Sequence, residues 1–412
     1  MPLIAKFNSY RIEFPNLNSG VMITIRNSVF NIDAILKKHA DIVLPRLNKI
    51  TDFYIDLFQY LAVSESNRRV TNFVFSNEVD GIIKRHGITN FNGLLNSLLI
   101  KKIIKNRTTF GIIRHDLKRI PAAKSVSPLI PLLKSLKRNL PRIMNYDLTV
   151  GRNAQLYKFA VQHYSEIAFL FPQIFDYENW FSLLAPDKTW GPYQLTAALK
   201  LNTCPYCNRQ YTFTIIDIGG EKIARPELDH FLPKQRHPML AVSFFNLIPS
   251  CTICNGSIKG DIDVLHSTHL SPYDHNPGHA AMRFTYYPKS YAAAIGLTEN
   301  LSIEVHYSGS TSNVALRTKV EGSINLFCLN QVYQNHKDVV REIIRKRHIS
   351  SDRYIQTIQN TFSGFSLTAE EAYLFAFGNY HNENSFYKRP LSKLTRDIAV
   401  ELSMLKEYNP SK

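Results

Sequence analysis

The sequence predicts an α+β protein that is mostly helical, with a small β-containing region in its middle. Apolar residues recur at helical spacing from about residue 31 to 201, and again from about 324 to the C-terminus. Between these stretches, residues 202–308 alternate apolar and polar side chains over short runs, as strands do. The central region also holds four of the five cysteines, arranged as two Cys-x-x-Cys pairs.

The N-terminal stretch predicts a few strands followed by helices. Residues 1–30 contain short alternating runs that are typical of a small hairpin or of edge strands. The helical pattern then continues to about residue 201, and residues 153–172 form a long candidate helix. Proline lacks an amide donor and interrupts helices, so we expect helix boundaries near Pro121, Pro128, Pro131 and Pro141.

The segment 101–143 is rich in basic residues and poor in aromatic ones. Two interpretations fit this pattern: a solvated helical face, or a surface that follows the phosphates of a nucleic acid. The basic residues are Lys101, Lys102, Lys105, Arg107, Arg114, Lys118, Arg119, Lys124, Lys134, Lys137, Arg138 and Arg142.

The central region begins with a predicted β-hairpin. Residues 211–216 and 222–228 form its strands, and Gly219-Gly220 supplies the turn. Further strands are expected within 282–308, and a basic helix is expected around 337–347. These patterns predict three domains: a mainly helical one at 1–190, a central one at 191–290, and a β segment with helices at 291–412.

The charge balance favours a polyanionic partner. Lysine and arginine total 49 and aspartate and glutamate total 33, which leaves a net charge of +16 at pH 7. Nucleic acid fits such a surplus because neutralised phosphates release counterions; a merely basic protein, or a binder of acidic proteins, is the alternative. No stretch approaches the roughly 20 apolar residues that span a bilayer, and residues 1–10 lack a signal-peptide pattern. We therefore expect a cytoplasmic protein.

The paired cysteines predict a metal site. In a chain without a secretion signal, the pairs Cys204/Cys207 and Cys251/Cys254 are better explained as metal ligands than as disulfides. Four thiolates suit a closed, tetrahedral, structural Zn²⁺, the alternative being four unrelated buried cysteines. Cys328 lies among apolar neighbours and is expected to be a small buried hydrophobic residue.

An acidic residue and a histidine lie between the two pairs, in the order that resembles the HNH endonuclease signature. Asp229-His230 comes first, Asn246 precedes the second pair, and Asn255 follows its last cysteine. The resemblance covers residues 204–259. It implies an embedded, zinc-bound ββα-metal domain that hydrolyses phosphodiester bonds.

The resemblance also assigns roles. It makes His230 the general base, Asp229 and Asn255 the ligands of a catalytic Mg²⁺ or Mn²⁺, and Asn246 a brace for the loop that orients the histidine. Asn255 stands where many members have histidine. The residue types suit this chemistry independently, because a histidine with a pKa near ~6.5 accepts a proton at neutral pH and oxygen donors prefer hard cations. Lys259, four residues after Asn255, is expected to contact a phosphate.

Other polar residues near the motif are weaker candidates. Lys234 and Arg236 are further candidates for phosphate contact. The histidines that follow match no metal-ligand spacing, and we expect them at the surface or in loops: His237, His266, His269, His275 and His279.

The wider sequence is similar to HNH proteins of Septu-type and retron-associated anti-phage systems. The similarity rests on residues 204–211, 228–234, 243–251, 271–274 and 326–336. It implies a DNA endonuclease, with RNA as an alternative substrate, that works beside an ATPase partner. A non-catalytic zinc module that binds nucleic acid or a partner protein is the competing hypothesis.

Overall fold

The computed structural model describes residues 25, 31–66, 77–88, 127–147, 151–182, 189–274, 281–349, 358 and 367–404. The strands expected in 1–30, the basic residues from Lys101 to Lys124, and the histidines at 275 and 279 lie outside these ranges. Within them, no helix has the length and apolar character needed to cross a membrane.

The chain divides into two compact units that interleave along the sequence. The first unit comprises Met1–Ile32, Thr196–Phe231 and Ile248–Lys412. The second comprises Asp33–Leu195 and Leu232–Leu247. We describe each unit by itself.

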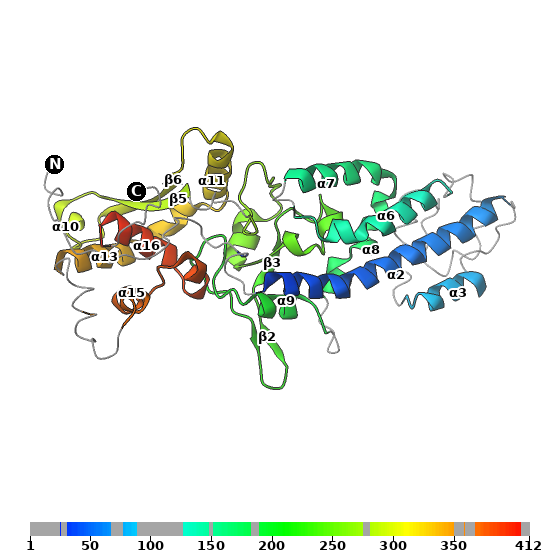
Figure 1. Cartoon of the computed structure of the whole chain (residues 1–412), viewed down its shortest axis with the longest axis horizontal. Helices are drawn as coiled ribbons and strands as arrows, with labels where there is room; N and C mark the ends of the chain where they lie inside the picture. Colours follow the sequence, from blue (N-terminus) through cyan, green and yellow to red (C-terminus); the bar gives the residue numbers. More distant parts are fainter. Residues whose placement is uncertain are drawn as a thin grey trace. The chain divides into compact units, whose positions relative to one another are not determined.

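The second unit is helical (Figure 1). Its elements are α2 (Ile32–Ser66), α3 (Asn77–Arg85), α6 (Leu129–Met144), α7 (Gly151–His163), η3 (Ser165–Leu170), α8 (Phe171–Ile174), η4 (Tyr177–Phe181), η5 (Pro238–Leu240) and η6 (Phe244–Asn246). The long helix predicted over 153–172 is therefore two helices with a 3₁₀ segment between them. Pro128 precedes α6 as predicted, whereas Pro141 lies inside that helix. Pro141 falls in the last turn, so the hydrogen bond that it removes is near the helix end.

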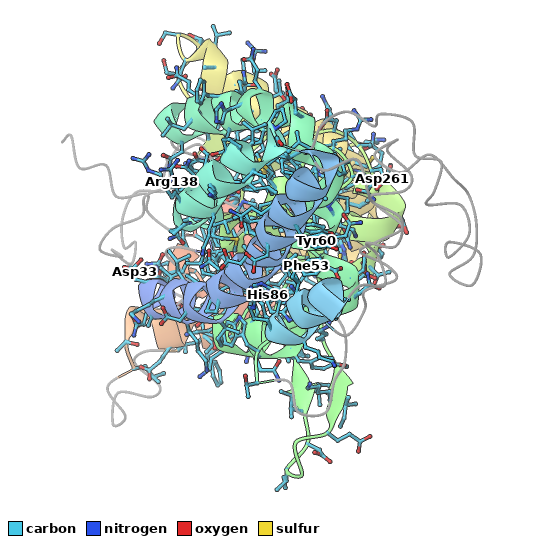
Figure 2. All side chains as sticks on the ribbon, turned by 90° about the vertical axis from the view of Figure 1, so that its right-hand side faces the viewer. Asp33, Phe53, Tyr60, His86, Arg138 and Asp261 are labelled. Atoms are coloured by element: carbon cyan, nitrogen blue, oxygen red, sulfur yellow. The ribbon has the colours of Figure 1, made fainter. Side chains whose placement is uncertain are left out.

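Polar contacts join the helices of the second unit. Asp56 of α2 accepts hydrogen bonds from Arg85 (3.0 Å) and His86 (2.9 Å) at the end of α3. The ring of His86 also meets Phe53 of α2 edge-on, and both side chains are marked in Figure 2. Lys137 of α6 donates to Asp52 of α2 at 2.7 Å. This basic residue of the 101–143 segment is therefore engaged in an ion pair within the unit.

A buried histidine lies at the centre of the second unit. His39 Nε2 donates to the carbonyl of Val242 (2.8 Å), and the indole N–H of Trp190 donates to His39 Nδ1 (3.1 Å). Phe181 and Phe244 meet the imidazole edge-on. Burial lowers the pKa of His39 to about 4, so the ring is neutral at physiological pH.

The described part of the first unit contains three two-stranded sheets. Strand β1 (Ile215–Ile216) pairs with β2 (Lys222–Ala224), β3 (Glu227–His230) with β4 (Leu247–Ser250), and β5 (Met282–Pro288) with β6 (Leu301–Tyr307). The predicted strand over 222–228 is divided between β2 and β3. Pro226 lies at the break, where its missing amide cannot continue a ladder.

Helices complete the first unit. They are η7 (Ile253–Lys259), α10 (Tyr291–Ala294), α11 (Val314–Leu326), α12 (Leu329–Val332), η9 (Tyr333–His336), α13 (Lys337–Ile349), α15 (Ala369–Phe377), η11 (Glu383–Lys388) and α16 (Ser392–Glu401), and α9 (Pro192–Leu199) runs into the unit from the second. Helix α13 confirms the predicted basic helix. Cys328 is partly exposed rather than buried, and it occupies a left-handed position (φ 48°) between α11 and α12.

Candidate functional site

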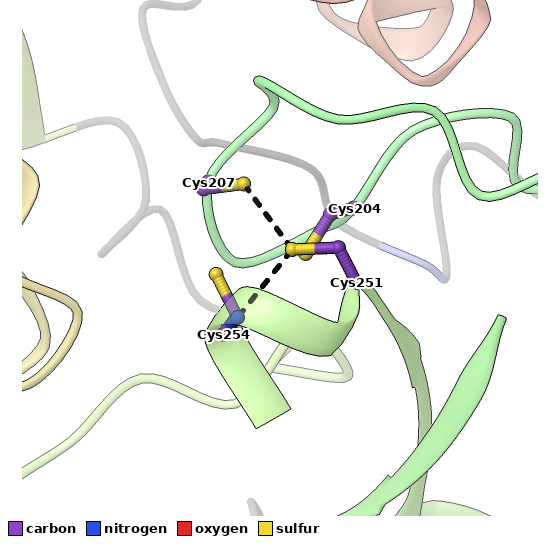
Figure 3. A group of neighbouring side chains, drawn as sticks. All are labelled: Cys204, Cys207, Cys251 and Cys254. Carbon is purple, nitrogen blue, oxygen red and sulfur yellow. Dashed lines mark hydrogen bonds between the residues drawn. The ribbon is translucent and has the colours of Figure 1, made fainter. Parts of the chain in front are cut away.

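The two cysteine pairs meet in the first unit. The sulfur atoms of Cys204, Cys207, Cys251 and Cys254 all lie within 4.8 Å of one another (Figure 3). Cys207 Sγ and Cys251 Sγ are 4.0 Å apart. Four sulfurs at about 2.3 Å from one tetrahedral zinc ion would be about 3.8 Å apart. The cluster therefore fits a single zinc ion.

Burial explains why this cluster needs a cation. Cys204 is fully buried, and burial raises the pKa of its thiol well above the ordinary value. Several thiolates cannot ionise together in an apolar interior unless a positive ion offsets their charge. A Zn²⁺ ion held by the four thiolates would supply that charge, and its binding would then be part of the folding of this unit.

The first cysteine pair forms a tight turn that later parts of the chain hold in place. The amide of Asn208 donates to the carbonyl of Cys204 (2.8 Å), and Asn208 adopts a left-handed conformation (φ 47°). The hydroxyl of Tyr333, from η9, donates to the carbonyl of Cys207 (2.5 Å). The turn is thus packed against a segment more than a hundred positions later in the sequence.

Strand β3 carries a buried carboxylate with two donors. Asp229 Oδ2 accepts from the hydroxyl of Tyr206 (2.5 Å), and Oδ1 accepts from Lys259 Nζ (2.8 Å). Asp229 is 2% exposed and Lys259 is 1% exposed. Burial raises the pKa of Asp229, and the attraction of the Lys259 ammonium opposes this shift without cancelling it.

Helix η7, which contains Cys254 of the second cysteine pair, is a π-helix. The amide of Gly260 donates to the carbonyl of Asn255 (2.8 Å), five residues back. In this wider turn Asn255 and Lys259 both contact strand β3. The side-chain amide of Asn255 donates to Glu227 Oε2 at 2.7 Å, and π-turns of this kind often occur at functional sites.

Glu227 is a site residue that the sequence interpretation missed. It lies two positions before Asp229, so both side chains project from the same face of β3. That spacing was available in the sequence, but nothing there indicated that Asn255 would reach Glu227. Tyr206 was missed for the same reason, since its partner is far along the chain.

The structure places the remaining predicted residues as follows. His230 ends β3 and is 8% exposed, and its carbonyl accepts from Lys259 Nζ (2.8 Å). Asn246 belongs to the second unit, where its side chain bonds both backbone groups of Leu232 (2.8 and 3.0 Å) and the carbonyl of Leu240 (3.1 Å). These bonds brace the loop, and a role for Asn246 in orienting His230 stays a prediction.

The lysines predicted to contact phosphate have other partners. The ammonium of Lys259 is enclosed by Asp229 and the His230 carbonyl, so it does not face solvent where a phosphate would arrive. Lys234 pairs with Glu178 (2.6 Å).

The four cysteines are the only potential metal cluster among the residues described.

Oxygen donors that suit a hard divalent ion lie on β3 and η7. Asn255 and Glu227 are partly exposed, and amide and carboxylate oxygens suit Mg²⁺ or Mn²⁺. Both oxygens of Asp229 accept hydrogen bonds, from Tyr206 and Lys259, and its role as a ligand of a divalent ion stays a prediction.

Comparisons with known proteins find two similar chains. The first is the Septu protein PtuB of Bacillus thuringiensis, which is 34% identical over 103 residues, or 24% of this chain and 37% of that protein. The second is protein ea31 of Escherichia phage lambda, which is 36% identical over 72 residues, or 17% of this chain and 20% of that protein. No protein-family profile and no solved structure matches. The chain is thus related to a Septu protein over a segment that spans little more than a third of that relative.

Proposed function

We propose that this chain is a metal-dependent endonuclease of the HNH type that hydrolyses phosphodiester bonds in DNA. One observation carries the proposal: strands β3 and β4 and helix η7 bring Glu227, Asp229 and Asn255 together beside the cysteine cluster. The likeness to a Septu protein supports a role in defence against phage.

The residues of this site have separate roles in the proposed reaction. His230 takes the proton from the attacking water, the role of general base that histidine fills most often in enzymes. Lys259 binds both Asp229 and the His230 carbonyl, and so fixes the end of β3 from which the histidine projects. A divalent ion, when bound through Asn255 and Glu227, supplies positive charge to stabilise the developing phosphorane.

Partners follow from charge and from the same likeness. The net charge of +16 favours a nucleic acid; we propose DNA, with RNA as the alternative. An ATPase partner and a cytoplasmic location complete the proposal.

A second candidate function is a zinc module that binds nucleic acid or a partner without catalysis. The observation that favours it is the enclosed state of Asp229, which Lys259 and Tyr206 occupy on both oxygens. A binding module would need the zinc turns but no open metal site.

Cleavage of plasmid DNA and of RNA with Mg²⁺ or Mn²⁺ separates the two candidates. We expect the wild-type protein to cut and His230→Ala to lower the rate by roughly 10²–10⁴-fold with its fold intact, because the variant lacks the general base. The matched control is His348→Ala, a histidine on α13 that bonds the carbonyl of Ala294, and it should cut normally. A wild-type protein that cuts neither substrate, alone or with its partner, would establish the binding module instead.

A further inference from the structure

Tyr206 occupies an unusual position between the zinc turns and the acidic strand. It lies inside the first cysteine pair, between Cys204 and Cys207. Its ring is buried and stacks on Phe327 at 4.3 Å between centroids, with 21° between the planes. Its hydroxyl donates to Asp229 Oδ2 at 2.5 Å. The stacking fixes the Tyr206 ring in a position from which its hydroxyl reaches the Asp229 carboxylate.

The other carboxylate oxygen of Asp229 is linked to the second cysteine pair. Asp229 Oδ1 accepts from Lys259, which is the last residue of η7. Helix η7 also contains Cys254. The two cysteine turns are therefore joined twice: once through the sulfur cluster, and once through the chain of contacts Tyr206–Asp229–Lys259.

These contacts bury the Asp229 carboxylate, so few other hydrogen-bond donors can reach it. Asp229 is 2% exposed, so water cannot readily replace a lost hydroxyl. A buried acceptor that loses one donor is strongly penalised, and its side chain shifts to recover a partner. Because Asp229 and His230 are adjacent at the end of β3, any such shift is transmitted to the proposed base.

We propose that Tyr206 is a positioning residue that locks Asp229 to the zinc turns, so that the metal site and the end of β3 behave as one hydrogen-bonded unit. Its effect on zinc is independent of catalysis. Its effect on cleavage rests on the proposed nuclease function.

Zinc release from the holoprotein to a chromogenic chelator tests the proposal without any cleavage assay. Groups that hydrogen-bond a metal's ligands change its affinity by roughly 10–100-fold, and the Tyr206 hydroxyl acts one step further out, on Asp229. We expect Tyr206→Phe, which keeps the ring and its stacking, to speed zinc release by about 10-fold. Asp229→Asn should do likewise, and the double variant should release zinc no faster than the faster single variant.

Tyr333→Phe is the matched control. Tyr333 is also buried, and its hydroxyl donates to the Cys207 carbonyl, rather than to Asp229, at the same distance of 2.5 Å. In the double variant Tyr333→Phe/Asp229→Asn, the rate of zinc release should rise by the product of the two single-variant factors. If Asp229→Asn folds poorly, the Asp229→Asn/Lys259→Met background, which removes both buried charges, replaces it in the comparison.

The outcomes are distinct. The proposal is overturned if Tyr206→Phe releases zinc at the wild-type rate. It is also overturned if the Tyr206→Phe/Asp229→Asn double variant speeds zinc release by the full product of the two single-variant factors. In the cleavage assay, Tyr206→Phe should lower kcat with little change in KM, while His348→Ala should keep the wild-type kcat. If the wild-type protein does not cut, the nuclease function fails, and the zinc measurements still decide the role of Tyr206.

Discussion

Lys259 places an ammonium group in the interior of the first unit, where it donates to Asp229 and to the His230 carbonyl. A buried ion pair adds little to folding stability by comparison with an apolar pair of the same shape. The loss of one partner, however, leaves the other charge buried without compensation. The pair is therefore a sensitive point for stability as well as for the geometry of β3.

We expect Lys259→Met to lower the free energy of unfolding by about 3–5 kcal/mol, because the Asp229 carboxylate stays buried. Urea unfolding of the zinc-loaded protein measures this change. The exposed pair Lys37–Asp41 provides the control, and Lys37→Met should match the wild type. The double variant Asp229→Asn/Lys259→Met should recover part of the loss; no recovery would contradict the explanation.

His39 predicts a pH dependence for the second unit. Its folded-state pKa of about 4 lies below the unfolded value of 6.5, so the unfolded chain binds more protons between these values. Stability is therefore present above pH 6.5 and falls by up to about 1.4 kcal/mol per unit as the pH drops toward 4. Urea unfolding between pH 7 and pH 4 should show this slope, and His39→Gln should flatten it. Equal slopes for both proteins would rule out His39 as the cause.

At the scale of elements, helix α16 begins without a cap of its own. Leu391 precedes it in a left-handed conformation (φ 62°) and has no side-chain acceptor. Asn208, next to the first cysteine turn, supplies the missing acceptors: its Oδ1 accepts from the Lys393 amide (3.2 Å), and its carbonyl accepts from the Leu391 amide (2.6 Å). The helix is thus capped from a distant part of the chain.

Asn208→Ala should fray the first turn of α16 and cost about 0.5–2 kcal/mol, the range for loss of a helix cap. Hydrogen exchange of the amides of residues 392–395 measures the fraying. The control is Asn313→Ala, which removes the ordinary cap of α11 and should leave α16 protected. Unchanged exchange in α16 would show that Asn208 does not cap it.

At the scale of the whole molecule, the two units differ, over the residues described, in whether they contain a cluster that could hold a metal ion. The cysteine cluster belongs to the first unit, and the described part of the second contains no comparable group. The second unit relies instead on the packing of its helices, with buried residues such as Leu47, Phe53 and Leu136.

A strong chelator should therefore unfold the first unit and leave the second largely protected. Structural zinc contributes on the order of 10 kcal/mol to folding in zinc-finger peptides. Hydrogen exchange followed along the chain, with and without chelator, measures the effect unit by unit. Cys254→Ser should behave like the chelated protein and Cys328→Ser like the wild type. Protection of the first unit without metal would show that the cysteines fold without an ion.

The sequence alone determined the features that depend on local order and spacing. The matched cysteine pairs predicted a shared cluster, and the structure brings all four sulfurs together. Helical periodicity predicted α2 and α13, and alternation predicted β6. Asp229, His230 and Asn255 could be singled out because their order around the cysteines is itself a pattern, although their catalytic roles stay predictions.

Only the tertiary structure decided which distant side chains meet. Lys259 has the same sequence spacing whether it faces solvent or Asp229, and the π-turn and its packing on β3 enclose it. Tyr206, Glu227 and Asn208 gained partners that no local pattern indicates, because burial and long-range hydrogen bonds depend on how the chain folds back. Periodicity records which side of an element is apolar; it does not record what lies against that side.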